Sequence, residues 1–482
     1  MGTFTDECDN IRGGMLIAKG SVLYRDYYTQ HTPLGYYLCG IFAFLGAGSI
    51  QQFRLLYYIL MSAVWGGLYY RHSAYFGRLR MLLLPLAQIW ITMPMFFQAS
   101  KILGDNIQGI CMVALAMEFM RYWEDEELGR SRCLIAAACI FLSIASAFVS
   151  VFALVPVAAG VLIKEVLIWK RNGGCSLRSC VRRYGCLMGA TAAPFAVTLL
   201  YFTYHHAAGQ MYRMAYQFNT MVYNRYQDGQ YGKVKWKPFF LGIKNYFEMI
   251  SSNFNSVITA GGNDTAVIQL LIGVTAVAVL LFWGTGMKKR EDMIAAIALF
   301  LCLCWNGTRS GTDFHAAALW DLAIAVIFLA GARGNGYGKW KEKKPAVFAA
   351  AALGCYILQP YAATVADHVV YHPEIVDGVD EAVAAMTVPG EKIFIDAYKH
   401  DSIYLMYKER YPVNRNCYLL PWYMDWFEQD TIDDLEANMP NILVYQPESE
   451  IYPAAEICPL LDQVIRTHYE SLGEGAAVWK LK

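Results

Sequence analysis

The residues best suited to chemistry gather near the start of the chain. Asp6 and Glu7 place two carboxylates side by side, and the polar stretch that follows contains Tyr24, Arg25 and Asp26. A carboxylate can act as a general base when it lies within hydrogen-bond reach of a hydroxyl group. The same pair could instead be a solvated chain end or a helix cap, because negative charge is favourable at a helix N-terminus. The spacing alone leaves both interpretations open.

Other charged residues adjoin apolar segments further along the chain. Arg54 begins one of them, where its guanidinium could hold a phosphate through two hydrogen bonds or could simply extend to a membrane interface. Asp105 opens another, where a carboxylate could equally cap the helix. His31, Arg309 and His315 also adjoin apolar segments, and each has an ordinary structural role as the alternative.

Composition excludes some classes of function. The 40 basic and 40 acidic residues give no net charge, so no global field points to nucleic acid. Most of the 13 cysteines lie in apolar runs and act as small apolar side chains, and none has the spacing of a zinc site. A disulfide between Cys417 and Cys458 is possible, but the sequence cannot establish it.

Long apolar stretches must position these residues. The chain has 482 residues, of which 56% are hydrophobic and 17% charged, against about 25% charged in an average soluble domain. Ten stretches predict transmembrane helices, although several are near the lower limit of about 17 residues. They are 53–70, 79–97, 106–121, 133–148, 150–168, 184–203, 266–285, 292–308, 315–331 and 345–364.

The distribution of Lys and Arg predicts which side each loop faces. Basic clusters lie at 71–80, 170–183, 288–290 and 339–344, and counting spans places all four on one side. Cytoplasmic loops are enriched in Lys and Arg, so this side is the cytoplasm. The outer side then receives residues 1–52, the loop near Asp105, the loops 204–265 and 309–314, and the tail from about 365.

The apolar run 34–48 is short for a span, and we interpret it as an interfacial or re-entrant helix. This keeps residues 1–52 outside. A chain that starts outside implies either a missing preceding helix or outward insertion of the N-terminus.

The C-terminal part has the composition of a soluble fold. Strands are predicted at 392–396, 441–445 and 477–481, and helices at 374–387 and 453–467. This predicts a small α/β domain that serves as a lid or docks an acceptor, since it carries no phosphate loop or nucleophile motif.

Residues 6–56 resemble the first extracytoplasmic loop of the GT-C membrane glycosyltransferases, which include protein O-mannosyltransferases and the aminoarabinose transferases of lipid A. The shared pattern is the Asp6-Glu7 pair, the stretch from Gly20 to Asp26, His31 before Pro-Leu, an interfacial helix, and Arg54 in the next span. Gly104-Asp105-Asn106, His315, the topology and the terminal domain extend the resemblance more weakly.

The resemblance implies a mostly α fold, a polytopic transmembrane helical bundle with a small extracytoplasmic α/β C-terminal domain. The expected parts are an active-site loop at 1–52, a bundle of about ten helices at 53–364, and the α/β domain at 365–482. Relatives carry one more transmembrane helix before the loop, so the resemblance leads us to expect such a helix upstream of residue 6.

The resemblance also implies an activity. The chain would be an inverting glycosyltransferase that moves a sugar from a polyprenyl-phosphate donor to a hydroxyl acceptor on the outer face of a bacterial cytoplasmic membrane. The acceptor could be a lipid, a polysaccharide or a protein, membrane lipids would be partners, and nucleic acid would not. Asp6 and Glu7 would be the catalytic carboxylates, and Asp105 could hold a divalent metal. The substrate-binding residues would be Tyr24, Arg25, Asp26, His31, Arg54, Asp105, Arg309 and His315.

Two other interpretations stay open. A transporter or lipid flippase is one, although such folds usually contain internal repeats and midplane charges, and we find no repeat. A non-catalytic subunit for assembly of the cell envelope is the other, and the missing first helix favours it.

Overall fold

The structure is a computed structural model, and it is mostly helical with one small sheet. It describes residues 5–95, 101–172, 177–223, 237–259, 264–285, 290–307, 314–330, 378–396, 410–448, 452–473 and 476–482. The chain divides into two compact units. The helical unit comprises the described residues within 58–198 and 235–371. The mixed unit comprises those within 2–57, 199–234 and 372–482.

The helical unit is built around α5 (Gly104–Asp125), which is buried along nearly its whole length. Helices α6 (Arg130–Ser146), α7 (Ser150–Arg171) and α14 (Ala317–Leu329) pack against it. A helix that is covered on all sides belongs to the core of a bundle. The unit also contains α4 (Arg78–Met95), α11 (Lys237–Thr259), α12 (Asp264–Thr285), α13 (Arg290–Asn306), the 3₁₀ turn η2 (Phe314–Ala316), and most of α3 (Ile50–Phe76) and α8 (Leu177–Tyr204).

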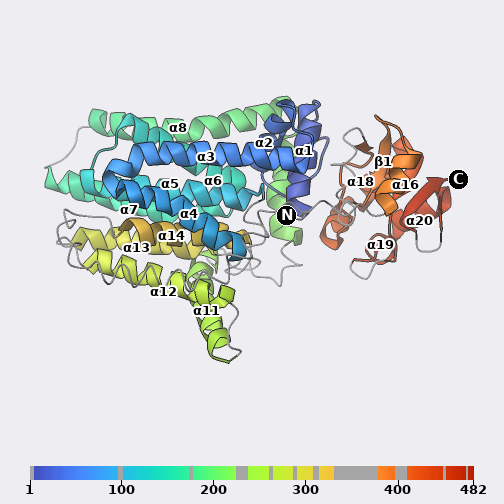
Figure 1. Cartoon of the computed structure of the whole chain (residues 1–482). Coiled ribbons are helices and arrows are strands. Elements are labelled where there is room, and N and C mark those ends of the chain that lie inside the picture. Colours follow the sequence, from blue (N-terminus) through green and yellow to red (C-terminus); the bar gives the residue numbers. More distant parts are fainter. Residues whose placement is uncertain are drawn as a thin grey trace. The chain divides into compact units, whose positions relative to one another are not determined.

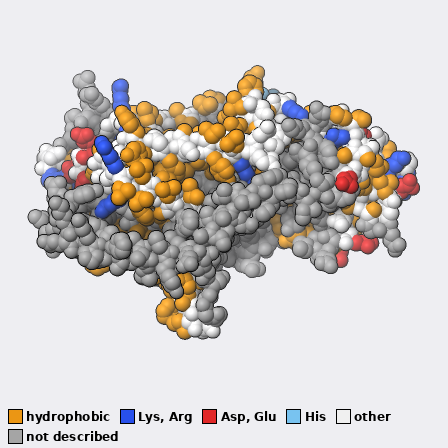
Figure 2. Space-filling model, viewed as in Figure 1, with side chains coloured by type: hydrophobic (Ala, Val, Ile, Leu, Met, Phe, Trp, Pro, Cys, Tyr) orange, Lys and Arg blue, Asp and Glu red, His pale blue; other side chains and the backbone are white. Residues whose placement is uncertain are grey.

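Within the described residues, three helical segments are long and apolar enough to cross a membrane: Ser150–Arg171, Tyr184–Tyr204 and Ala266–Trp283. Large hydrophobic side chains are exposed along α3, α4, α7 and α8, and Figure 2 shows such side chains over much of the visible face of the helical unit. Apolar patches of this size on a protein surface mark contact with a partner or a membrane. These features indicate a membrane protein.

Nine of the ten predicted spans coincide with helices, and the tenth, 345–364, lies outside the described residues. Figure 1 shows the long helices of the helical unit running in roughly the same direction. Some are short for a bilayer, since α13 has 17 residues and α14 has 13. The ten-span topology and its sidedness stay predictions.

Two charged side chains within the predicted spans, Glu118 and Lys164, are paired. Glu118 on α5 accepts hydrogen bonds from Arg71 and from Arg132, the latter at 3.2 Å from its Nε. The ammonium of Lys164 on α7 lies 2.9 Å from a carboxylate oxygen of Glu126. Because a buried charge is costly unless it is paired, these contacts explain how the apolar helices accommodate ionic groups.

The mixed unit contains a five-stranded sheet with strand order β2-β1-β3-β5-β4. The strands are β1 (Lys392–Ile395), β2 (Tyr411–Pro412), β3 (Ile442–Val444), β4 (Tyr469–Ser471) and β5 (Val478–Leu481). Strand β1 is parallel to β2 and β3, whereas β5 is antiparallel to β3 and β4. The three predicted strands are confirmed as β1, β3 and β5, and the two short strands β2 and β4 were not expected.

Helices cover both faces of this sheet. Ile393 and Ile395 pack against α16 (Gly378–Met386), whereas the intervening Phe394 belongs to the larger core. This alternation is the period of two that a strand imposes on its side chains. The predicted helix at 453–467 is two helices, α19 (Ala454–Ile457) and α20 (Pro459–His468), because Pro459 begins a new helix. The aromatic-rich α18 (Pro421–Asn438) was not predicted. The thiols of Cys417 and Cys458 are buried and donate to the carbonyls of Asn414 and Ala454, so the disulfide that the sequence allowed does not form.

The N-terminal segment forms two helices, α1 (Thr5–Ala18) and α2 (Leu34–Phe44). Helix α1 ends before Gly20, whose positive φ of 101° suits a left-handed helix stop, and the NH of Gly20 donates to the carbonyl of Ile17. Helix α2 starts after Pro33 and ends before Gly46, which has a φ of 96°, so it is shorter than the predicted 34–48. The other elements of the mixed unit are α9 (Ala208–Tyr212) and the π-helix η1 (Arg213–Tyr223).

Helices α1 and α2 pack together through glycine. A Cβ atom at Gly14 would lie 2.4 Å from the Cβ of Cys39 and 2.7 Å from the backbone N of Gly40. Gly14 is therefore needed for the close approach of the two backbones.

We predict that Gly14→Ala lowers the free energy of unfolding by about 1–3 kcal/mol, because the added methyl group overpacks the contact. The control is Gly66→Ala on α3, where a Cβ would meet nothing within 4 Å. Alanine there should be neutral or stabilising by up to about 1 kcal/mol. Thermal unfolding of both variants in detergent measures the difference, and equal midpoints would contradict the close packing of α1 on α2.

Candidate functional site

A buried ion pair joins Glu7 and Arg54, which lie near the two ends of the sequence pattern in residues 6–56. Glu7, in the first turn of α1, accepts two hydrogen bonds from Arg54 near the start of α3, with the Arg54 Nε 3.0 Å from Glu7 Oε1 and the Nη2 bonded to Oε2. Only 5% of the Arg54 side chain and none of the Glu7 side chain is exposed. A two-pronged contact between guanidinium and carboxylate fixes both distance and orientation. The pair therefore sets where α1 lies on α3.

Asp6 has a different environment from Glu7. Successive residues on an α-helix point about 100° apart, so the two neighbouring carboxylates face different directions. Asp6 is partly exposed, whereas Glu7 is buried. Of the three carboxylates of α1, which are Asp6, Glu7 and Asp9, Asp6 is the one that a substrate could reach.

Asp9 was not recognised from the sequence, and it is the centre of a buried polar cluster. One carboxylate oxygen accepts a hydrogen bond from the hydroxyl of Tyr27 and the other from that of Tyr36. The Nδ1 atom of His31 lies 3.7 Å from Asp9 Oδ2 and 3.2 Å from the Tyr36 hydroxyl oxygen. The Thr29 hydroxyl, 2.6 Å from the same oxygen, completes the cluster.

The cluster determines the charge of Asp9. Burial alone would raise the pKa of Asp9, but the neighbouring His31, the positive charge of Arg12 and the Tyr27 hydroxyl lower this pKa below its usual value of 3.8. Asp9 is therefore ionised near neutral pH, and it presents a negative charge to the His31 ring. Since 35% of the His31 side chain is exposed, the ring connects this buried charge with the surface.

Three of the predicted binding residues shape the loop before His31. Tyr24 has a φ of 69° and its hydroxyl donates to the carbonyl of His31 over 2.8 Å. The carboxylate of Asp26 accepts the NH of Val22 over 2.8 Å and pairs with the exposed guanidinium of Arg25 at 2.7 Å. Their contacts stabilise the turn, which is a structural role.

The loop is also braced by the C-terminal part of the mixed unit. The backbone NH of Tyr28 donates to the carbonyl of Arg415 over 2.8 Å, and the Arg415 Nη1 donates to the Tyr28 hydroxyl over 2.8 Å. The NH of Gln30 donates to the hydroxyl of Tyr423 on α18 over 3.1 Å. Arg415 is itself held by Asp434, whose carboxylate lies 3.1 Å from its Nε. The loop with His31 is therefore supported from two sides.

The remaining predicted residues lie elsewhere. Asp105 is buried in the first turn of α5, and His315 lies partly buried in η2, both in the helical unit. Arg309 lies outside the described residues. Among the residues that the structure describes, no group of three or more His, Cys, Asp or Glu side chains could hold a metal ion. The mixed unit thus brings together Glu7 with Arg54 and His31 with Asp9.

Comparison with known proteins does not extend this assignment. No protein-family model matches the chain, and a search of curated proteins found no match.

We predict that Arg54→Met lowers the free energy of unfolding by about 3–5 kcal/mol, because it leaves the Glu7 carboxylate buried without its cation. The double variant Arg54→Met with Glu7→Gln should recover part of this loss, since it removes the charge as well. A double-mutant cycle on thermal or denaturant unfolding measures the coupling. Additive losses would contradict a direct pair.

We predict that Asp9 contributes to the acid sensitivity of the fold. Because its folded-state pKa is lowered, its stabilising contribution is complete above its usual pKa of 3.8 and is lost as the pH falls through the lower folded value. In the Asp9→Asn variant, the free energy of unfolding should fall less steeply than in the wild type as the pH drops below about 4. Stability against pH measures this, with the exposed Asp433→Asn as control. Parallel curves for the wild type and Asp9→Asn would contradict the assignment.

Proposed function

We propose that the chain is an inverting glycosyltransferase that transfers a sugar from a polyprenyl phosphate to a hydroxyl acceptor at the outer face of the cytoplasmic membrane. The observation that supports the proposal is the buried Glu7–Arg54 pair. The pair connects Glu7 and Arg54, which lie near the two ends of the stretch that resembles the GT-C active-site loop. The two ends of this stretch are therefore in contact in the folded chain. The three apolar helices that could cross a membrane are consistent with a lipid-linked substrate.

In this proposal Asp6 is the general base. It is the partly exposed carboxylate of α1, whereas Glu7 and Asp9 are buried. The acceptor hydroxyl gives its proton to Asp6 as its oxygen attacks the anomeric carbon. The bond between that carbon and the lipid phosphate oxygen breaks with its electron pair, and the phosphate leaves. One direct displacement inverts the configuration at the anomeric carbon.

The other residues of the site stabilise the leaving phosphate or hold neighbouring side chains in position. We assign Glu7 the role of holding Arg54 in place, because both of its oxygens bond the guanidinium. The partly exposed His31 can donate a hydrogen bond to the phosphate as its negative charge develops, whereas the buried Arg54 stays paired with Glu7 and positions α1. Asp9 holds the His31 ring from its buried side, with its carboxylate oxygen 3.7 Å from Nδ1.

We predict that Asp6→Asn lowers sugar transfer by about 10²–10⁴-fold, because an amide cannot accept the proton. Membrane vesicles that contain the full chain would be given polyprenyl-phosphate hexose and pentose donors labelled in the sugar. The control is Asp425→Asn, an exposed carboxylate on α18. Unchanged transfer by the Asp6 variant would remove Asp6 from the mechanism.

A further variant at the same position, Asp6→Cys, tests on which side of the membrane α1 lies. A cysteine at position 6 should react with a membrane-impermeant maleimide in intact cells whose outer layers have been made permeable. Labelling that occurs only after the cytoplasmic membrane is broken would contradict the proposed location.

A further inference from the structure

The helical unit contains a carboxylic acid, Asp321, that the proposed transferase reaction does not use. Asp321 lies in the second turn of α14, and the other residues of this helix are all apolar. Between Ala316 and Val326 every other residue is buried, whereas Asp321 is partly exposed. Asp321 therefore reaches the surface of the bundle at a point where α14 is otherwise covered.

No positive charge compensates this carboxyl group. Within the described ranges no Lys, Arg or His side chain contacts it, whereas Glu118 is held by Arg71 and Arg132. The backbone carbonyl of Asp321 accepts the side-chain amide of Gln88 on α4 over 2.9 Å, which positions the turn but leaves the acid without a counter-charge. An ionised carboxylate in apolar surroundings is unfavourable without a partner, and taking up a proton removes its charge.

The carboxyl group packs directly on α5. A Cβ atom at Gly109 would overlap Asp321 Oδ2 and would lie 3.1 Å from its Cγ, so glycine leaves the room that the acid occupies. The residue before it, Gln108, donates to Asn306 Oδ1 on α13 over 3.0 Å, and both of these side chains are buried. The neighbouring helices thus supply neutral polar groups to this part of the bundle.

The charged groups of the packed helices lie at other levels. On α5, the nearest in sequence are two acids, Asp105 four residues before Gly109 and Glu118 nine residues after it. His315 in η2 lies six residues before Asp321. In α4, α12 and α13 the charged residues lie only in the first turn. None of these groups contacts the Asp321 carboxyl group.

We propose that Asp321 is a proton-binding site of the helical unit, where the neutral acid packs on Gly109 and can be reached from the apolar phase around the bundle. Acids inside transmembrane bundles carry protons in pumps and transporters. The ligand of this site is a proton, and its uptake at Asp321 is separate from the sugar transfer that we assign to Asp6.

The experiment treats the full chain, in a neutral detergent at neutral pH, with the apolar reagent dicyclohexylcarbodiimide. The proton of the acid moves to a nitrogen of the reagent, the carboxylate oxygen bonds to its central carbon, and the acyl group then moves to nitrogen to give a stable N-acylurea. No group leaves, so the labelled peptide gains the mass of one reagent molecule. We expect this mass on the peptide that contains Asp321, and its loss in the Asp321→Asn variant.

Glu118 is the matched control within the same unit. Its contacts with Arg71 and Arg132 favour the ionised form, which does not react. Its labelling should therefore be lower than that of Asp321 by about tenfold or more.

Thermal unfolding gives a second measurement, which does not depend on access of the reagent. Asp321→Asn replaces a neutral acid by a neutral amide of the same shape, so its midpoint should stay within about 2 °C of the wild type. Glu118→Gln should lower the midpoint further, because it leaves two guanidinium groups without their anion.

Labelling of Asp321 together with an unchanged midpoint for Asp321→Asn supports the proton site. Two results overturn it: the Asp321 peptide stays unlabelled, or Asp321→Asn lowers the midpoint as much as Glu118→Gln, as the loss of an ionised and paired carboxylate would. Neither measurement involves sugar transfer, so this site and the proposed function fail independently.

Discussion

The N-terminal segment is constrained by the buried Glu7–Arg54 ion pair, because both charges are removed from water. Each of these charges loses its hydration on folding, and the loss is recovered only if the two groups meet in good geometry. The pair thereby fixes helix α1 against the start of α3. Helix α2 must then fit beside α1, and the contact at Gly14 allows it. The loop that carries His31 connects these two helices.

Helix α1 holds three carboxylates within four residues, and each has a different surrounding. Glu7 meets a guanidinium, Asp9 meets two tyrosine hydroxyls and the His31 ring, and Asp6 is partly exposed. Environment is what separates the roles of chemically equal groups in active sites. On this basis we propose that Asp6 exchanges a proton with the substrate, whereas Glu7 and Asp9 set the positions of Arg54 and His31.

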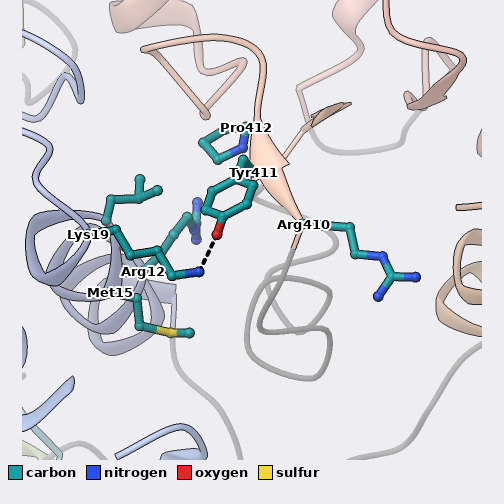
Figure 3. Close-up of a pocket in the computed structure, with 7 residues that line it drawn as sticks. Arg12, Met15, Lys19, Arg410, Tyr411 and Pro412 are labelled. Atoms are coloured by element: carbon teal, nitrogen blue, oxygen red, sulfur yellow. Dashed lines mark hydrogen bonds between the residues drawn. The ribbon is translucent and has the colours of Figure 1, made fainter. Parts of the chain in front are cut away.

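The N-terminal and C-terminal segments belong to one compact unit, although most of the chain separates them. Arg415 holds Tyr28, and Tyr418 and Tyr411 hold Arg12 and Lys19. The C-terminal segment therefore supports the loop that carries His31 and also contacts α1 through Arg12 and Lys19, and Figure 3 shows the contact between Lys19 and Tyr411. A change in this segment can alter the geometry around α1 without touching Asp6.

The sequence by itself determined the local elements. The apolar stretches predicted nine of the described helices, and short apolar runs predicted β1, β3 and β5. These predictions succeed because the pattern of apolar residues that favours a helix or a strand is local in the sequence. The resemblance at residues 6–56 also directed attention to Glu7, Arg54 and His31. Short strands such as β2 have no such pattern, since they form only where a partner strand exists.

Tertiary structure alone decided which carboxylate is buried and what it meets. Asp9 looks like any polar residue in the printed sequence, and its partners Tyr27, Tyr36 and His31 lie beyond the end of α1. The same holds for Arg12 and Lys19, whose ring partners come from the C-terminal segment. Burial and charge pairing depend on which faces of distant elements meet, and sequence spacing does not specify those meetings.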